Sequence, residues 1–135
     1  MPTKVLDSWA LLAFFKDEPA AGAVETLIEA ATKSGKPLLL SAINWAEVYY
    51  TMERAGGRAV AESVAAEIAT LPIAVLGVAD DLALARQAAQ FKAAHKLSLA
   101  DAFAAALAKD RQAELVTGDP EFGALEKEVR IEWLK

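Results

Sequence analysis

The stretch KVLDSWALLAFF, residues 4–15, contains the switch from strand to helix that decides the fold. Residues 4–6 form a short, mostly apolar run typical of a buried strand, and residues 8–16 have the apolar content of a helix. That helix is expected to end near Glu18, because a residue before proline disfavours the helical conformation. Asp7 therefore lies where a strand ends and a helix begins.

Short apolar runs alternate with alanine-rich stretches along the rest of the chain, which is typical of βαβ units around a parallel sheet. The further strands are expected at residues 38–40, 72–78, 114–117 and 129–133. The further helices are expected at residues 20–33, 42–55, 58–70, 80–94, 98–109 and, as a short one, 121–127. Because parallel strands require right-handed crossovers, this order predicts an α/β fold, a three-layer α/β/α sandwich with a five-stranded parallel sheet.

The composition predicts one domain over residues 1–135, since 135 residues with 55% apolar content can bury a single core. The absence of cysteine excludes disulfides, thiolate metal sites and a cysteine nucleophile. The sequence shows neither a signal peptide nor an apolar run of about 18 residues, so we expect a soluble, cytoplasmic protein. A net charge of −5 argues against a surface that binds nucleic acid everywhere, because such binding depends on Lys and Arg.

Four acids fall where this fold would place an active site: Asp7, Glu47, Asp101 and Asp119. In open α/β sheets ligands bind beyond the carboxyl ends of the strands, where Asp7 and Asp119 are expected. Two carboxylates about 4 Å apart repel by roughly 4 kcal/mol at an effective dielectric constant near 20, so gathered acids need a cation. Oxygen ligands without cysteine suit Mg²⁺ or Mn²⁺ rather than zinc. Our hypothesis is that Asp7 and Asp101 bind the principal ion and that Glu47 and Asp119 complete its shell.

Each acid also has a purely structural interpretation. Asp7 and Asp119 can cap the helices that follow them, and Asp101 can form a capping box with Ser98. Glu47 can lie on an exposed strip of its helix, or pair with a basic residue such as Arg54 or Lys92. Capping and metal binding are compatible, so these alternatives stay open.

Four blocks of the sequence together resemble the PIN-domain ribonucleases, and within them the toxins of VapBC toxin–antitoxin pairs. The blocks are the N-terminal strand that ends in Asp7-Ser8, SAINWAEVYY with Glu47, LSLADAFAAALA with Asp101, and VTGDPEF with Asp119.

This resemblance implies a sheet order of 3-2-1-4-5 and cleavage of RNA by an endoribonuclease that depends on Mg²⁺ or Mn²⁺. It implies that the four acids are the catalytic and metal-binding quartet. Ser8 and Thr117 would be supporting hydroxyl residues beside two of the acids, and Asn44 a polar residue one helical turn before Glu47. It further implies a homodimeric toxin that a small DNA-binding antitoxin holds inactive.

Two other classes of protein remain as alternatives. One is a non-catalytic interaction module whose acids are all helix caps. The other is a phosphate-handling α/β domain of a different family, but a dehalogenase-like enzyme needs a second Asp where this chain has Trp9. A receiver domain needs a phosphoacceptor at the end of the third strand, where this chain has residues 76–78, Leu-Gly-Val.

Two further groups of residues could contact a partner. The segment FKAAHK, residues 91–96, is the basic cluster nearest to Asp101 in sequence, and it suits either RNA binding or an ordinary helix end. Five aromatic residues are expected mostly in the core, with some available for a dimer or antitoxin surface: Trp9, Phe14, Phe15, Tyr49 and Tyr50.

Overall fold

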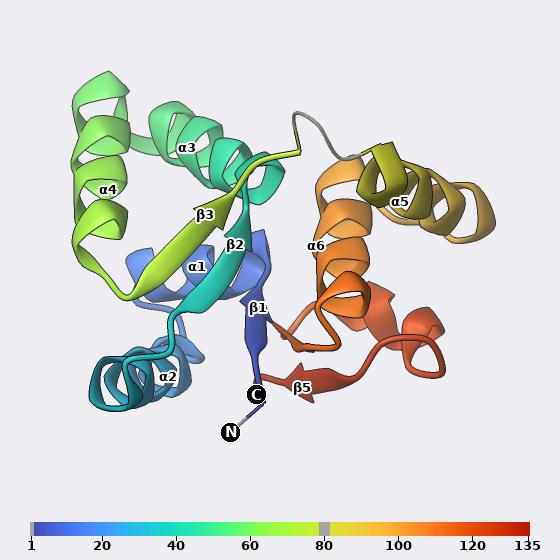
Figure 1. Cartoon of the computed structure of the whole chain (residues 1–135). Helices are drawn as coiled ribbons and strands as arrows, with labels where there is room; N and C mark the ends of the chain where they lie inside the picture. The colour runs from blue at the N-terminus through green and yellow to red at the C-terminus, as the bar shows by residue number, and fades with distance from the viewer. Residues whose placement is uncertain (1, 79–81) are drawn as a thin grey trace.

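A computed structural model describes residues 2–78 and 82–135 and contains one five-stranded parallel sheet with the order β3-β2-β1-β4-β5 (Figure 1). The strands are β1 (Lys4–Leu6), β2 (Leu38–Ser41), β3 (Ile73–Leu76), β4 (Glu114–Thr117) and β5 (Ile131–Trp133). Every neighbouring pair of strands is parallel. The predicted fold class and strand order are therefore confirmed.

Helices cover both faces of the sheet. They are α1 (Ser8–Phe15), α2 (Ala21–Ser34), α3 (Ala42–Gly56), α4 (Arg58–Thr70), α5 (Leu82–Ala94), α6 (Leu99–Asp110) and the 3₁₀ helix η1 (Pro120–Leu125). Figure 1 shows α1 to α4 on one side of the sheet and α5 and α6 on the other. This division follows from right-handed crossovers, because the chain moves outward from β1 to β3 and then returns past β1 to β4.

Three described elements have a boundary that differs by two residues from the sequence-based expectation, and the other differences are of one residue. The third strand ends at Leu76 rather than residue 78, because its partner in β2 is Ser41, where β2 ends and α3 begins. The last strand starts at Ile131 rather than residue 129, since the Val129 amide closes a turn onto the Leu125 carbonyl. The short helix expected at residues 121–127 is a 3₁₀ helix at Pro120–Leu125. The expected start of the fifth long helix, Asp80, lies outside the described residues.

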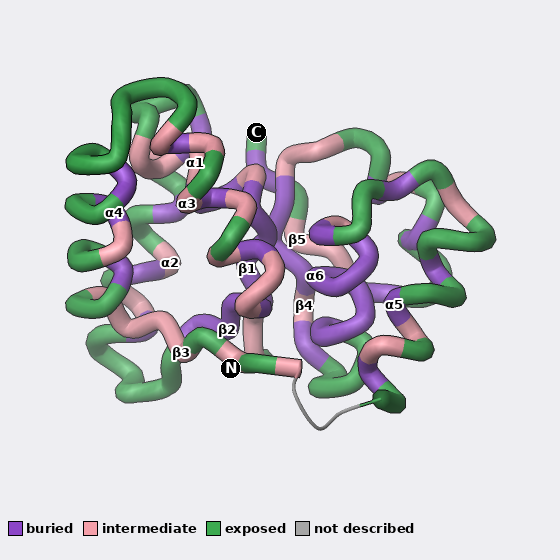
Figure 2. Tube along the Cα trace, turned by 90° about the horizontal axis from the view of Figure 1, so that it is seen from above, coloured by how far each residue is buried: buried purple, intermediate pink, exposed green. Residues whose placement is uncertain are grey.

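The core has two halves, one on each face of the sheet. Alternate residues of a strand point to opposite faces, so Val5 packs with α5 and α6 whereas Leu6 packs with α1 to α4. Helix α6 is buried along most of its length, as Figure 2 shows, and its buried residues include the alanines at positions 102, 104, 105, 106 and 108. These small side chains let the helix lie close to the sheet, which fixes the position of Asp101 in its first turn.

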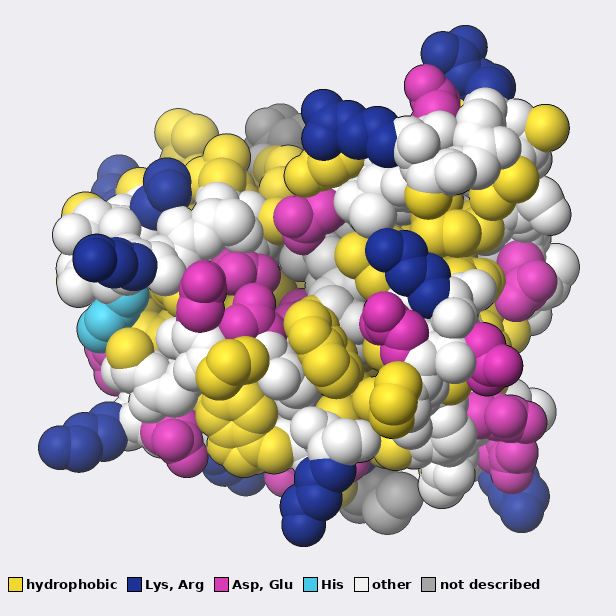
Figure 3. Space-filling view, turned by 180° about the vertical axis from the view of Figure 1, so that it is seen from behind, with side chains coloured by type: hydrophobic (Ala, Val, Ile, Leu, Met, Phe, Trp, Pro, Cys, Tyr) yellow, Lys and Arg dark blue, Asp and Glu magenta, His cyan; other side chains and the backbone are white. Residues whose placement is uncertain are grey.

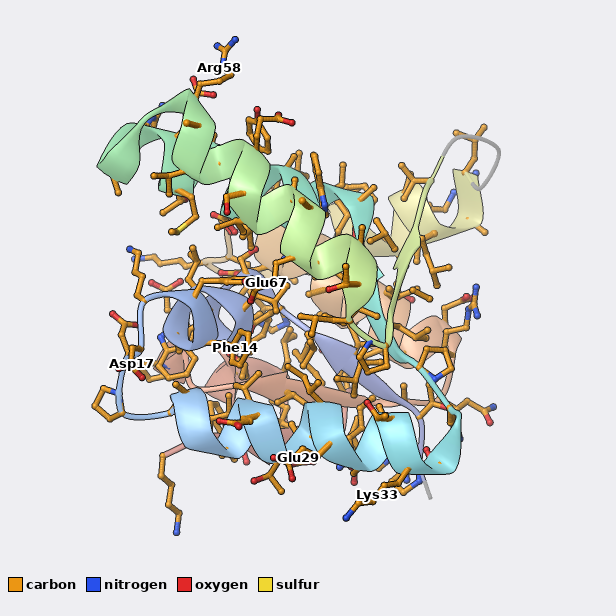
Figure 4. The ribbon with its side chains drawn as sticks, turned by 90° about the vertical axis from the view of Figure 1, so that its left-hand side faces the viewer. Phe14, Asp17, Glu29, Lys33, Arg58 and Glu67 are labelled. Atoms are coloured by element: carbon orange, nitrogen blue, oxygen red, sulfur yellow. The ribbon has the colours of Figure 1, made fainter. Side chains whose placement is uncertain are left out.

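The other face is built around α1. Figure 4 shows α1 between α2 and α4, with Phe14 at this junction, and the Phe14 and Phe15 rings meet edge to face at 5.2 Å. Both rings are half-buried against the core, as is Trp9, whereas Tyr50 is exposed. The expectation that most of the aromatic set belongs to the core fits this packing, and its role in a dimer or antitoxin surface stays a prediction. None of the helices described is long and apolar enough to cross a membrane.

Candidate active site

The site lies where the strand order reverses, between the neighbouring strands β1 and β4. Leu6 pairs with Val116, and the Asp7 amide continues the ladder by donating to the Val116 carbonyl at 3.4 Å. Asp7 directly follows β1, and Asp119 follows β4 after Gly118. The parallel pairing therefore brings two acids together that are more than a hundred residues apart in sequence.

Asp7 is fully buried and both of its carboxylate oxygens accept hydrogen bonds. The Ala10 amide donates to Oδ1 at 2.9 Å, so Asp7 does cap α1, and the Thr117 hydroxyl donates to Oδ2 at 2.5 Å. Thr117 Oγ1 also accepts from the Asp119 amide at 3.0 Å, which links the two acids through one hydroxyl. Burial raises the pKa of Asp7 to about 7, although these hydrogen bonds lower it, and the charges of Asp101 and Asp119 raise it further.

Asp101 reaches the same edge from the first turn of α6. The Ser98 hydroxyl accepts from the Asp101 amide at 3.1 Å, so Ser98 caps the helix as the sequence predicts. Partial burial raises the pKa of Asp101 to about 6, with further contributions from the charges of Asp119 and Glu47. The charges of Asp101 and Asp119 thus act on Asp7, and those of Asp119 and Glu47 act on Asp101.

Among residues 2–78 and 82–135, three acids lie close enough to share a metal ion: Asp101, Asp119 and Glu121, with one carboxylate oxygen from each lying within 4.8 Å of the others. Two ligands on opposite sides of a Mg²⁺ ion are about 4.2 Å apart, so small side-chain rotations would let these three oxygens hold one hard cation. The donors are all carboxylate oxygens, which fits magnesium or manganese. The predicted ligands Asp7 and Glu47 lie outside this tight group, and their assignment to the site stays a prediction.

Glu121 is the acid that the sequence-based prediction missed. Asp119 Oδ1 accepts from the Glu121 amide at 2.9 Å, and this cap starts η1 and turns the chain so that both carboxylates approach Asp101. A second acid two residues after Asp119 in GDPEF was the available signal. A 3₁₀ turn of this kind leaves no hydrophobic period in the sequence, so its direction was not predictable.

Glu47 is half-buried on α3, and Tyr50 donates its hydroxyl to Glu47 Oε2 at 3.4 Å. Neither suggested basic partner forms an ion pair with it. The Arg54 guanidinium lies over the Tyr50 ring, and Lys92 Nζ donates to the Leu97 carbonyl. Within residues 2–78 and 82–135 Glu47 therefore has no salt bridge, which leaves its charge to act on Asp101.

Asn44 and Ser8 join α3 to α1 beneath the acids. Asn44 Nδ2 donates to Ser8 Oγ at 2.9 Å, and Ser8 Oγ in turn donates to the Asn44 carbonyl at 3.4 Å. Both residues are buried, and Asn44 Oδ1 has no hydrogen-bond partner among the residues described. Asn44 lies one helical turn before Glu47 and Ser8 directly follows Asp7, and the supporting role of both residues stays a prediction.

Trp9 packs directly against the loop that carries Asp119. A β-carbon at Gly118 would lie 2.2 Å from Trp9 Cη2, which is far inside van der Waals contact. Glycine is therefore required between Thr117 and Asp119 by the close approach of the indole ring. The sequence held no signal for this contact, because it joins residues from opposite ends of the chain.

The basic segment at residues 91–96 is largely occupied by internal contacts. His95 Nε2 lies 3.4 Å from Glu128 Oε2, and Lys92 reaches a backbone carbonyl beyond the end of α5. These contacts suit the alternative of an ordinary helix end. A mostly apolar cavity is lined by Lys4, Leu27 and Leu38, at the opposite end of the strands from the acids.

Comparison with known proteins agrees with this arrangement. The model of the PIN domain family matches residues 4–128. The chain belongs to the PIN domain family. This membership favours the PIN interpretation over the dehalogenase-like and receiver alternatives.

Solved structures with the same fold come from VapBC systems. VapBC2 from Rickettsia felis, bound to a promoter DNA fragment, matches 98% of this chain and 99% of its own with a TM-score of 0.75 at 14% identity. DNA-bound VapBC from Salmonella typhimurium matches 98% of both chains with a TM-score of 0.73 at 19% identity. VapC20 from Mycobacterium tuberculosis, described as a sarcin-ricin loop cleaving toxin, matches 90% of this chain and 94% of its own with a TM-score of 0.67 at 21% identity. A search of curated proteins gave no match.

Proposed function

We propose that this PIN domain is an endoribonuclease that depends on Mg²⁺ or Mn²⁺ and acts as the toxin of a toxin–antitoxin pair. The observation that carries the proposal is the group of acids formed by Asp101 in the first turn of α6 with Asp119 and Glu121 at the start of η1. Membership of the PIN domain family supports the nuclease activity. The alternative of a non-catalytic module whose acids only cap helices does not account for their convergence.

In this proposal Asp101, Asp119 and Glu121 hold the cation, with Asp7 and Glu47 beside them. When bound, the ion would offset the charge of the scissile phosphate and lower the pKa of a water molecule. Asp7 must lose its proton to contribute, and the Thr117 hydroxyl orients its carboxylate.

The hydroxyl groups of Ser8 and Thr117, which flank Asp7, are poorly placed to act as nucleophiles. Ser8 is engaged with Asn44, and Thr117 is engaged with Asp7 and the Asp119 amide. We therefore assign the attack on phosphorus to water, and the role of the protein residues to binding and orientation.

The cellular role is proposed from the solved structures that share the fold. Two of these are VapBC structures bound to DNA, and a third is VapC20, described as a sarcin-ricin loop cleaving toxin. We infer a cytoplasmic toxin that acts on RNA, forms a homodimer and is inhibited by a cognate antitoxin. Toxicity on expression that is relieved by co-expression of a neighbouring reading frame would support this role, whereas harmless expression of an RNA-cleaving protein would contradict it.

The chemistry is tested by incubating purified protein with structured RNA in Mg²⁺ or Mn²⁺ and in EDTA. We expect cleavage only with the metal, and its loss in Asp101→Asn. Asp110→Asn is the matched control, because Asp110 is an exposed acid at the other end of the same helix. Cleavage that persists in EDTA, or that Asp101→Asn leaves unchanged, would refute the metal-dependent mechanism.

A further inference from the structure

One face of α3 carries an acid, an aromatic ring and a cation in succession. Glu47, Tyr50 and Arg54 are spaced by three and four residues, so they follow one another along the same side of the helix. Tyr50 donates its hydroxyl to Glu47, and the Arg54 guanidinium carbon lies 4.9 Å from the centre of the Tyr50 ring. This row begins at the acidic site and leads away from it.

Tyr50 is exposed although it is a large aromatic residue. Its exposed fraction is 45%, whereas Tyr49 beside it is half-buried and stacks on Trp45. The ring of Tyr50 is therefore not used by the core. An exposed ring next to a nuclease site is a surface on which an unpaired base can stack, and such stacking tolerates any base because every base has an aromatic face.

Arg54 differs in its contacts from Arg58, Arg111 and Arg130. Arg58 and Arg111 form ion pairs with Glu53 and Asp110, and Arg130 donates to a backbone carbonyl. Among the described residues Arg54 has no carboxylate partner, and only the Tyr50 ring holds it in place. Its donors remain available for a ligand, and a planar guanidinium can bind a phosphate through two hydrogen bonds.

The rest of the surface makes a local cation more important. The chain carries a net charge of −5. On the face that Figure 3 shows, the Lys and Arg side chains are scattered rather than gathered into one positive patch. An RNA strand that approaches the acids needs a positive charge close to them. Arg54 lies about 10 Å from Glu47 along the helix axis, which is of the order of one to two nucleotides of an extended strand.

We propose that Tyr50 and Arg54 form the substrate-binding row of this nuclease. Tyr50 stacks on an unpaired base next to the cleavage point, and Arg54 binds the phosphate beyond it. The substrate is therefore RNA whose bases are unpaired at the cleavage site, such as a loop, because only unstacked bases can reach the ring. This inference rests on the proposed ribonuclease function and adds the residues that position the strand.

Steady-state cleavage of a loop-containing RNA separates binding from chemistry. We expect Arg54→Gln to raise KM about tenfold with kcat changed less than twofold, and to reduce the salt dependence of RNA affinity by about one phosphate contact. Tyr50→Ala should raise KM at least fivefold, whereas Tyr50→Phe, which keeps the ring, should leave KM within about twofold of the wild type. Because Arg54 rests on Tyr50, the two losses should be less than multiplicative in the double variant.

The matched control is Arg111→Gln, which removes the same charge at the other end of α6 from Asp101 and should leave KM unchanged. Fluorescence anisotropy with the same RNA, in an Asp101→Asn background, measures binding without cleavage, and melting curves confirm that each variant is folded. Cleavage by the wild type with KM and salt dependence unaltered in Arg54→Gln and Tyr50→Ala would overturn this inference and leave the ribonuclease function intact. A wild-type protein that neither cleaves nor binds RNA would overturn both.

Discussion

Asp7→Asn should make the metal-free protein more stable at alkaline pH, although it removes a residue that we assign to the active site. Asparagine has nearly the same shape, and its Oδ1 can still accept from the Ala10 amide. Its amide can donate to Thr117 Oγ1, which has a second lone pair free beside the bond from the Asp119 amide. The substitution therefore removes a buried charge while keeping both contacts of the side chain.

The size of the effect follows from the raised pKa of Asp7. An acid whose pKa rises from 3.8 in the unfolded chain to about 7 in the folded protein binds more protons when folded, so the free energy of unfolding falls as pH rises through this window. Above pH 7 the full pKa difference lowers the free energy of unfolding by about 4 kcal/mol. Of this loss, about 3 kcal/mol occurs between pH 5 and pH 8. The hydroxyl proton of Thr117 loses its acceptor in the variant, which costs about 1 kcal/mol at every pH.

Thermal melting in EDTA at pH 5 and pH 8 measures this difference. The Tm of Asp7→Asn minus that of the wild type should be about 10 °C larger at pH 8 than at pH 5, since 1 kcal/mol corresponds to about 3–5 °C in a domain of this size. Asp17→Asn is the control, because Asp17 is exposed and its substitution should give the same difference at both pH values. If the Tm difference between Asp7→Asn and the wild type does not change with pH, the argument that burial opposes the ionisation of Asp7 is refuted.

Three further predictions concern the metal and the packing around it. In millimolar Mn²⁺ the Tm of the wild type should rise more at pH 8 than at pH 5.5, because the metal competes with protons on acids whose pKa values are about 7 and 6; an equal rise at both would contradict this. Glu121→Gln should weaken Mn²⁺ binding about tenfold in the same assay, whereas Glu126→Gln, which changes an exposed acid at the end of η1, should not. Gly118→Ala should destabilise the protein by about 1–3 kcal/mol, because its β-carbon would overlap the Trp9 ring, and a further change of Trp9 to Ala should remove part of that effect. Gly22→Ala is the control for it, because a β-carbon there meets no atom within 4 Å.

The strand order and the two helical layers were predictable because they depend on patterns that survive in the sequence. The strands are short, and β1 and β4 occupy the residues expected for them. The boundaries of these two strands are set by residues next to them in the sequence, such as the helix-capping Asp7, so they can be read from the sequence. The end of β3 was not predictable, because it depends on where the partner strand β2 stops pairing. When a neighbouring strand determines where a strand ends, the residues of the strand itself do not reveal that end.

The acids could be placed in the right region for a similar reason. Asp7, Asp101 and Asp119 each follow a signal for the end of a strand or the start of a helix, and parallel strands carry such ends to one edge. Glu121 and the contact of Trp9 with Gly118 were missed, since they depend on the direction of a 3₁₀ turn and on the position of one ring. The expectation that capping and metal binding are compatible fits the structure, because Asp7 and Asp119 both cap helices and lie in or near the acidic group.

Because Asp7 and Asp119 both cap helices and lie in or near the acidic group, their roles bear on the stability of the site before a metal binds. A carboxylate that only capped α1 could lie in solvent, where ionisation costs nothing, yet Asp7 is fully buried and faces other negative charges. The fold tolerates this arrangement because Thr117 and the Ala10 amide hold the carboxylate in one orientation. Such local destabilisation is typical of functional sites, where a ligand offsets the strain. A divalent cation would offset it, so we expect metal binding and the stability of the folded chain to be strongly coupled above neutral pH.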